Sequence, residues 1–410
     1  MRIDLAFPAL PPALNGIGDY TALLAAELAT RHVVRVLTAQ ADAAPIHGVE
    51  VVEVGIPGVT SGATPGAMRA GPLLGAVAAA PPDWLIVQYN PFSYGRWGLN
   101  LRLPWALQGF RASHPRSRLA VMVHEPFVPV DGWKNAAMTT WQRAQLAALV
   151  RAADLVFVST EQWAQHFARW FPATPVHALP VGSNIPEVPG PPDATMRRRI
   201  GIGEHEVVLG LFGSAHPSRL LAFIRTAAET VAESGHAVRV LYVGPHGVPV
   251  REALAPIPIL DAGPLPAASV SHHFRAMDLY LAPFRKGVSE RRGSFMAGLQ
   301  HGIATVSTQG KHTGPALRCQ DGKAFLLAPD RDATCFAQHA LALVADPARR
   351  AAIGHAGRVY FEHAFSWARI AADLESKLSD GSRGVPVSSP AVRATGLLAS
   401  RPLRPRPTRV

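Results

Sequence analysis

A chain of 410 residues is longer than one ordinary domain and fits two domains of roughly 150–200 residues each. Hydrophobic residues make up 48% and charged residues 17%, which excludes global disorder, and no run of eighteen apolar residues predicts a membrane-spanning helix. The N-terminal segment has too short an apolar core for a signal peptide, so we expect a cytoplasmic protein.

The formal net charge of +11 is concentrated in part at the C-terminal end. Residues 381–410 contain six arginines and no acid among Pro, Ser and Gly, a composition that predicts a disordered basic tail. Such a tail is either simply solvated or weakly attracted to an anionic membrane surface, which would place the protein peripherally at the inner face. Its arginines are not interleaved with aromatics, so no nucleic-acid partner is expected. The only cysteines, Cys319 and Cys335, have no partners at metal-ligand spacing and indicate a reduced compartment.

Short apolar runs alternate with helical stretches along the first half of the chain. Continuous apolar runs of this kind predict a parallel sheet covered on both faces. Between the first two runs, Ile17, Tyr20, Leu24 and Leu28 recur at three- and four-residue steps and predict an amphipathic helix. The predicted strands begin at Ile3, Val33, Val49, Trp84, Leu119, Leu155 and Val176.

The segment PEVPGPP, residues 186–192, interrupts this alternation and predicts a linker. The alternation then restarts, and a last helix carries Trp367, Ile370, Leu374 and Leu378 on one face. We therefore predict an α/β fold of two doubly wound Rossmann-like domains that face a central cleft. The predicted strands of the second half begin at Val207, Val238, Ile257, Leu279, Ala304 and Ala324.

Two turns in the first half follow predicted strands and so lie at the cleft. The first, NGIGDY at residues 15–20, contains glycines that allow backbone N–H groups to approach an anion at a helix N-terminus, although a plain strand-to-helix turn remains the alternative. It is not a dinucleotide fingerprint, because Thr21 stands where the third glycine would be. In the second, His124 and Glu125 follow the fifth strand, where the imidazole could contact a phosphate or a sugar, or be a structural histidine.

The second half offers a further phosphate-binding turn, FGSAHPSR at residues 212–219, with Arg219 on the first helical turn. Asp330 and Asp332 resemble an acidic metal-binding pair, but we interpret them as a loop and a helix cap, so no metal site is expected. The most specific stretch is GVSERRGSFMAGLQHGIATVST, residues 287–308, where Arg291 and Arg292 precede a helix predicted to begin near Ser294. It predicts a diphosphate at the helix N-terminus clamped by arginine, with a solvated basic loop as the alternative.

Taken in order, these motifs resemble the GT-B glycosyltransferases of the glycogen-synthase-like superfamily of retaining enzymes, over residues 1–378. PVGSNIP (180–186), DLYLAP (278–283) and FSW (365–367) are further markers. The chain resembles a divergent, family-four-like subgroup, because the two glutamates usual in this family fall at Ser289 and Ala297. Glu290 is a candidate for the place of the first, since the loop after Pro283 is two residues longer than usual.

The resemblance also implies a domain organisation and a set of site residues. It implies an acceptor domain (1–185), a linker (186–202), a nucleotide-sugar donor domain (203–355), a helix that crosses back to the first domain (356–380) and the tail (381–410). His124 matches the catalytic histidine beside the transferring sugar, and Ser214 replaces an arginine of the family's phosphate-binding turn. The implied donor site comprises Gly16, Gly213, Arg219, Ser289, Glu290, Arg291, Arg292, Gly293 and Ser294, with Gly18, Asp19, Tyr20 and Glu125 on the acceptor or sugar side.

The implied function is transfer of a sugar from a nucleotide-diphosphate sugar to an unidentified glycan, lipid or small-molecule acceptor, with retention and without metal or other cofactor. Such enzymes require positive charge at the leaving diphosphate rather than a carboxylate nucleophile, so the missing glutamates are compatible with activity. The alternatives are a sugar-nucleotide epimerase or a phosphorylase on the same fold, or a non-catalytic relative that binds a nucleotide sugar. A phosphorylase would need a pyridoxal-phosphate lysine in a second domain where lysine is scarce.

Overall fold

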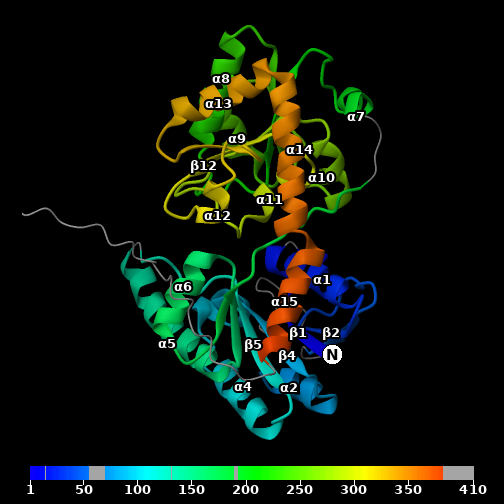
Figure 1. The fold of residues 1–410 in the computed structure, drawn as a ribbon, viewed down its shortest axis with the longest axis vertical. Coiled ribbons are helices and arrows are strands. Elements are labelled where there is room, and N and C mark those ends of the chain that lie inside the picture. The colour runs from blue at the N-terminus through cyan, green and yellow to red at the C-terminus, as the bar shows by residue number, and fades with distance from the viewer. Residues whose placement is uncertain (14, 55–69, 131, 189–192, 382–410) are drawn as a thin grey trace, which may run out of the picture.

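The structure is a computed structural model, and it describes residues 1–13, 15–54, 70–130, 132–188 and 193–381. Two α/β domains, each built on a parallel sheet, follow one another along the long axis of the molecule (Figure 1). The predicted fold class is confirmed. The predicted disordered tail lies outside the described residues apart from Gly381, the last residue of the final helix.

The N-terminal domain is built on seven parallel strands in the order β3-β2-β1-β4-β5-β6-β7. Every residue of the apolar run that forms β4 is buried, as expected inside a parallel sheet covered on both faces. The strands are β1 (Arg2–Ala6), β2 (Val33–Thr38), β3 (Glu50–Glu53), β4 (Trp84–Tyr89), β5 (Arg118–Val123), β6 (Leu155–Val158) and β7 (Val176–Ala178).

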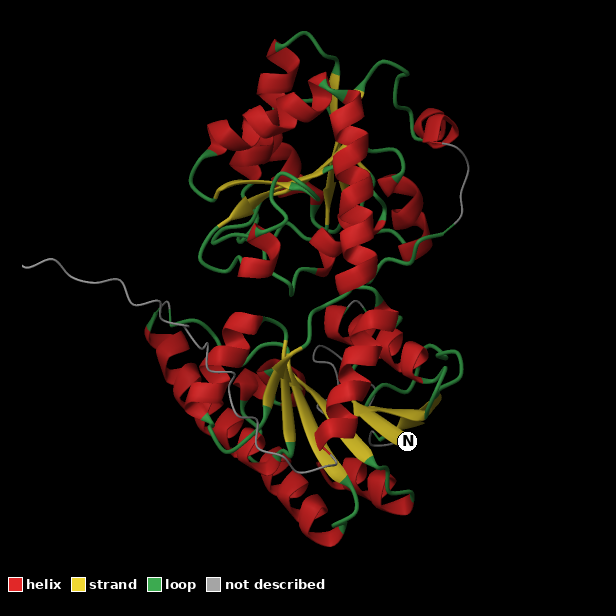
Figure 2. Cartoon of the chain, viewed as in Figure 1, coloured by secondary structure: helices red, strands yellow, loops and turns green. Residues whose placement is uncertain are grey.

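Helices cover both faces of this sheet (Figure 2). One face packs against α1 and the C-terminal helix α15, and the other against α2, α4, α5 and α6. Side-chain oxygens cap several helix starts, among them Asn15 at α1 and Thr160 at α6. The helices are α1 (Gly16–Leu28), α2 (Ala70–Ala79), α3 (Pro91–Tyr94), the short 3-10 helix η1 (Arg96–Gly98), α4 (Arg102–Ser113), α5 (Trp133–Ala152), α6 (Glu161–Trp170) and α15 (Trp367–Gly381).

The C-terminal domain repeats the plan with six parallel strands in the order β10-β9-β8-β11-β12-β13. Its core has two parts, one under α8, α9 and α13 and the other under α10, α11 and α14. The elements are β8 (Val207–Phe212), α8 (Leu221–Glu233), β9 (Val238–Val243), α9 (Gly247–Leu254), β10 (Ile259–Asp261), α10 (Ala267–Phe274), β11 (Leu279–Ala282), α11 (Gly293–Gln300), β12 (Thr305–Gln309), α12 (Pro315–Arg318), β13 (Leu326–Pro329), α13 (Ala333–Ala345) and α14 (Pro347–Ala364).

The thirteen predicted strands are all present, and two of them begin two residues later than expected. Pro258 precedes β10 and has no N–H for the ladder. Before β13, the Ala324 N–H donates to the Gln320 carbonyl and so belongs to a turn. The helix cap expected at Asp332 is confirmed, because its side chain accepts from the Cys335 N–H at the start of α13.

The last two helices connect the domains. α14 packs against α11 of the C-terminal domain, whereas α15 lies against α1 of the N-terminal domain (Figure 1). The face predicted for the last helix is confirmed, since Ile370, Leu374 and Leu378 are buried in the N-terminal core. The proposed domain bounds remain a prediction. The predicted linker, residues 186–202, contains a short helix, α7 (Asp193–Arg199). The predicted end of the donor domain, at residue 355, falls inside α14.

Gly18 is fixed by close packing between α1 and the loop that follows β1. A Cβ atom at this position would lie 2.4 Å from the Ala9 carbonyl oxygen, which is backbone and cannot yield easily. We expect Gly18→Ala to lower the free energy of unfolding by about 1–3 kcal/mol through overpacking. Gly109→Ala on α4 is the control, because its Cβ would meet nothing within 4 Å; it should raise stability by about 0.5–1 kcal/mol. Urea unfolding of both variants checks this, and equal midpoints would contradict it.

Candidate active site

Two cavities open between the domains, where the strands of both sheets end. The small cavity has a volume of about 280 Å³ and the large cavity about 830 Å³, and both are lined by Asn184, Arg292 and Gly293. The small cavity is lined mainly by the C-terminal domain, and the large cavity mainly by the N-terminal domain. A molecule with two parts could therefore occupy both cavities at once.

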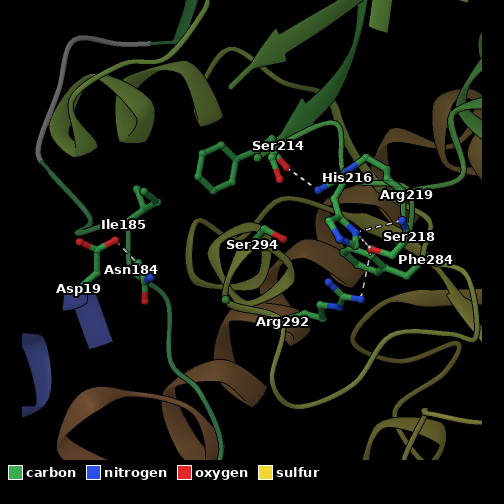
Figure 3. A pocket seen from close by; sticks show the side chains of 13 residues that line it. Asp19, Asn184, Ile185, Ser214, His216, Ser218, Arg219, Phe284, Arg292 and Ser294 are labelled. Carbon is green, nitrogen blue, oxygen red and sulfur yellow. Dashed lines mark hydrogen bonds between the residues drawn. The ribbon is translucent and has the colours of Figure 1, made fainter. Parts of the chain in front are cut away.

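Two arginines stack on one phenyl ring in the small cavity (Figure 3). The guanidinium carbons of Arg219 and Arg292 lie 5.2 and 4.6 Å from the centre of the Phe284 ring. Burial, together with the charges of Arg291 and Arg219, lowers the pKa of Arg292 to about 10, so it remains a cation at neutral pH. Among the described residues, neither Arg219 nor Arg292 forms an ion pair with a carboxylate. The small cavity thus holds two cations, neither of which forms an ion pair with a described residue.

The hydrogen bonds of these arginines leave donors free. Arg219 Nη2 donates to the Phe212 carbonyl at 2.7 Å, while its Nε and Nη1 are buried without a hydrogen bond. Arg292 Nη2 makes one long hydrogen bond, of 3.4 Å, to the Ser218 hydroxyl. Buried N–H groups without acceptors are costly, so this arrangement is suited to a ligand with several acceptor oxygens. A diphosphate has that chemistry.

Backbone groups complete the same wall. Gly213 is the first residue of the turn that follows β8, and its φ of +99° is a conformation that favours glycine. A Cβ atom on Gly213 would lie 3.3 Å from Arg219 Nη2. Gly293 and Ser294 are the first residues of α11 and line the small cavity. No side chain caps this helix, so its first N–H groups and its dipole favour an anion.

Asp19 and Asn184 form the opposite wall of the small cavity (Figure 3). Asn184 Nδ2 donates to the Gly16 carbonyl at 3.3 Å and lies 3.5 Å from Asp19 Oδ2, while Asn184 Oδ1 is buried and unpaired. Burial raises the pKa of Asp19 to about 6, and the Asn184 hydrogen bond offsets this only in part. Asp19 is therefore the one lining carboxyl of the small cavity, and it changes charge near neutral pH.

This carboxyl predicts a pH dependence of anion binding. Below pH 6 Asp19 is neutral, and as the pH rises through about 6 it becomes an anion in the cavity that holds Arg219 and Arg292. We expect a nucleotide-diphosphate sugar, whose phosphates do not titrate in this range, to bind more weakly at pH 7.5 than at pH 5. In a His216→Asn background, which takes the lining imidazole out of the small cavity, Asp19→Asn should remove this slope when binding is measured by calorimetry. A parent affinity that is flat or rises between these pH values would contradict the assignment.

His124 lies in the large cavity at the end of β5. Its Nε2 lies 2.7 Å from Gln88 Oε1, and its ring packs edge-on against Tyr20 at 4.8 Å between ring centres. Burial and the charge of Arg291 lower the pKa of His124 to about 3, so the imidazole is neutral at all physiological pH values. With Nε2 donating to the Gln88 oxygen, Nδ1 is the acceptor that remains.

Arg291, the neighbour of Arg292 in the loop, lines the large cavity and not the small cavity that contains Arg219. Its Nη2 lies 4.0 Å from Glu125 Oε1, and Glu125 also accepts a 3.0 Å hydrogen bond from Asn90 Nδ2. Arg291 therefore has a carboxylate within ion-pair distance, whereas Arg292 has none among the described residues. Of these consecutive arginines, Arg291 lines the large cavity alone, whereas Arg292 lines both cavities.

The remaining residues implied by the resemblance divide into two groups. Tyr20 and Glu125 of the sugar or acceptor side line the large cavity, and so does Gly16, which the resemblance assigns to the donor site. Gly18, Ser289 and Glu290 are among the lining residues of neither cavity. The assignment of all these residues to a donor or acceptor site stays a prediction.

Glu290 is buried behind the cavity wall. Glu290 Oε1 fills the space beside Gly314, because a Cβ atom on Gly314 would lie only 2.3 Å from it. Glu290 Oε2 has no hydrogen-bond partner. Burial raises the pKa of its carboxyl. Ala297, at the place of the second family glutamate, is fully buried in the core under α11. Neither position therefore presents a carboxylate among the residues that line the two cavities.

Sequence reasoning missed several residues that line or support the site. Asn184 lies within the PVGSNIP segment that was noted as a marker, and Ser218 lies within the FGSAHPSR turn, so local signals existed for both. Phe284 and Gln88 had none, because the contacts that define their roles come from segments distant in sequence. Among the described residues, no group of three or more potential metal ligands comes together.

Comparisons with known proteins place this geometry in context. Residues 15–182 match the family described as glycosyl transferase 4-like domain. No curated protein matches the sequence.

Solved structures match over nearly the whole chain at low sequence identity. Sucrose-phosphate synthase from Thermosynechococcus elongatus has a TM-score of 0.68 at 17% identity and covers 93% of this chain and 98% of its own. Anabaena HepE in complex with UDP and glucose has a TM-score of 0.64 at 15% identity, and the match covers 93% of this chain and 100% of HepE. A mutant of S. aureus TarM in complex with Fondaparinux, alpha-GlcNAc-glycerol and UDP has a TM-score of 0.65 at 10% identity, over 92% and 99%. Residues 15–182 thus match a glycosyl transferase 4-like domain, and the two domains together have the GT-B fold.

Proposed function

We propose that this protein is a glycosyltransferase that moves a sugar from a nucleotide-diphosphate sugar to an acceptor. The observation that carries the proposal is the pair of cations, Arg219 and Arg292, that share one cavity without a carboxylate partner. Free guanidinium donors and the start of α11 face the same space, so they favour a diphosphate. The GT-B structures in complex with UDP support this choice of ligand.

The donor diphosphate would lie in the small cavity and the sugar would point toward His124. Arg292 and Gly293 line both cavities and so mark the passage from one to the other. Transfer is proposed to proceed with retention, as the resemblance to retaining enzymes implies, with Arg219 and Arg292 stabilising the leaving diphosphate. The acceptor, a glycan, lipid or small molecule, would enter through the large cavity of the N-terminal domain.

Cationic side chains would take the place of a metal ion at the diphosphate. Charge developing on the leaving phosphate would meet the Arg219 and Arg292 donors already in position, which lowers the barrier without reorganisation. The missing family glutamates would cost ribose or sugar contacts rather than the leaving-group chemistry. Binding is therefore proposed to be independent of divalent metal.

The test is a thermal-shift screen against UDP-, GDP-, ADP- and TDP-sugars in the presence of EDTA, followed by turnover of any nucleotide sugar that raises the melting temperature. We expect stabilisation without metal, and release of the nucleoside diphosphate as water takes the sugar in place of the acceptor. Stabilisation without turnover would indicate a non-catalytic binder. Inversion of the free nucleotide sugar would indicate an epimerase, and phosphate-dependent release of sugar phosphate a phosphorylase. A requirement for magnesium would contradict the cationic clamp.

A further inference from the structure

Large apolar side chains are exposed along one side of the N-terminal domain, on η1, α4 and α5. Trp97 is 58% exposed, Trp105 is 77% exposed and Trp133 is 79% exposed. Tryptophan is highly buried on average, so three such indoles in one region are unusual. Leu101, also exposed, precedes Trp105 by four residues and lies on the same side of the start of α4.

Hydrogen bonds place these residues along one pair of helices. The Trp97 carbonyl accepts from Trp141 Nε1 of α5 at 3.1 Å, and the Asn100 N–H donates to Gln145 Oε1 at 2.6 Å. Arg111 near the end of α4 donates to the Ala152 carbonyl at the end of α5. The two helices therefore run side by side in the same direction. Both lie on the same face of the sheet.

The indoles follow this pair of helices in a row. Trp133 begins α5 and precedes Trp141 by eight residues, a spacing that keeps both on one side of the helix. Trp97 lies beside Trp141, and Trp105 lies farther along on α4. We call the surface formed by Trp97, Leu101, Trp105 and Trp133 the α4–α5 face.

The charge of this surface is predominantly positive. Neither α4 nor α5 contains an Asp or Glu, and residues 91–153 hold eight arginines and lysines against two acids. Arg96, Arg102, Lys134 and Arg143 are exposed on the same segments, and Lys134 Nζ lies 5.6 Å from the centre of the Trp133 ring. Exposed tryptophans among basic residues are typical of surfaces that lie in the interface of an anionic membrane.

The backbone holds one of these indoles outward at a cost. Trp97 has φ +62°, a left-handed conformation that is uncommon for a bulky residue, and the next residue, Gly98, has φ +72°. A side chain on Gly98 would lie 2.4 Å from Gln142 Nε2, so the turn is built around α5. Strain of this kind persists where surrounding structure enforces it and points to a function for the displayed group. Trp97 also lines the large cavity.

We propose that the α4–α5 face docks the protein on an anionic membrane surface. The indoles enter the headgroup region, the arginines and Lys134 contact lipid phosphates, and the mouth of the large cavity lies next to the bilayer. None of the helices in the described ranges has the length and apolarity of a membrane span, so this contact is interfacial. The docking surface is separate from the small cavity and does not depend on the proposed transfer reaction.

The experiment is co-sedimentation of the full chain with phosphatidylcholine vesicles, with and without phosphatidylglycerol. We expect binding only to the anionic vesicles, weakening as salt is added. Trp105→Ser/Trp133→Ser should lower the partition coefficient by at least about tenfold, because two inserted indoles are lost. The control is Val248→Ser/Val359→Ser, which changes two exposed apolar residues of the C-terminal domain and should bind like the parent. Circular dichroism checks that both variants fold.

Three outcomes would overturn the proposal. The parent could fail to bind anionic vesicles, or the tryptophan variant could bind as tightly as the parent, which would place the contact elsewhere, including residues 382–410. Sedimentation velocity could instead show a parent dimer that the tryptophan variant loses, with no vesicle binding by either, which would identify the face as a contact between copies. Donor binding measured in parallel is unaffected by these outcomes, so a failure here leaves the proposed function to its own test.

Discussion

Arg292→Ala is expected to weaken binding of the nucleotide-diphosphate sugar by roughly tenfold to 150-fold, because a charge-assisted contact is worth about 1.5–3 kcal/mol. The guanidinium lies on the Phe284 ring with a single long hydrogen bond to Ser218, so its remaining donors are available to the ligand. A larger loss is expected in kcat/KM than in donor affinity, since charge grows on the leaving phosphate in the transition state. Calorimetry and steady-state kinetics measure the two effects.

The unliganded variant should be at least as stable as the parent. Burial and two neighbouring arginines lower the pKa of Arg292, which means that the folded state disfavours its charge. Removing a cation from beside Arg219 relieves that repulsion, and so we expect a melting temperature that does not fall. A site assembled for an anion commonly costs stability in the empty protein.

Two further variants make the test specific. Arg285→Ala is the matched control, because Arg285 is an exposed cation of the same loop that lines neither cavity. Arg291→Ala should have a smaller effect than Arg292→Ala on donor binding, since Arg291 has the Glu125 carboxylate within ion-pair distance. Parent-like affinity and turnover in the Arg291→Ala/Arg292→Ala protein would mean that the basic loop is only solvated and that the site lies elsewhere.

The loop around these arginines shows what the sequence can and cannot predict. Its place between a strand and a helix follows from local patterns, since apolar runs predict β11 and β12 and the carboxyl ends of parallel strands meet at one edge. The direction of each side chain does not follow. Glu290, Arg291 and Arg292 are consecutive, yet Glu290 lies against Gly314, Arg291 lines only the large cavity and Arg292 lines both cavities.

Irregular backbone explains that difference. Within a helix or strand, a period of 3.6 or 2 residues assigns each side chain to a face, but a loop has no period. The partners that orient this loop lie far away in sequence: the Glu290 carbonyl accepts from the Val181 N–H, and Phe284 packs between Arg219 and Arg292. Gln88 could not be predicted from the sequence for the same reason. Its side chain contacts His124 only because β4 and β5 are neighbouring strands.

His124→Ala is expected to lower kcat by at least about tenfold, or 1.4 kcal/mol, while donor affinity changes much less. The imidazole lines the large cavity, where the sugar would react, and not the small cavity, where Arg219 and Arg292 would hold the diphosphate. The Gln88 contact and the Tyr20 ring fix its orientation, so Nδ1 can accept a hydrogen bond from a sugar hydroxyl at a defined place. His177→Ala, which removes a partly buried histidine of β7 away from both cavities, is the control.

The pH profile distinguishes this role from general acid–base catalysis. Because burial and Arg291 lower the pKa of His124 to about 3, the imidazole stays neutral from pH 5 to 8 and its titration contributes no limb to kcat in that range. A general base with a pKa near neutrality would produce such a limb. In the Asp19→Asn/His216→Asn background, which removes the carboxyl and the imidazole that line the small cavity, kcat should therefore be flat with pH. A limb near pH 6.5 that disappears in His124→Ala would show that the histidine exchanges a proton during turnover, and would overturn its assignment as a neutral hydrogen-bond acceptor.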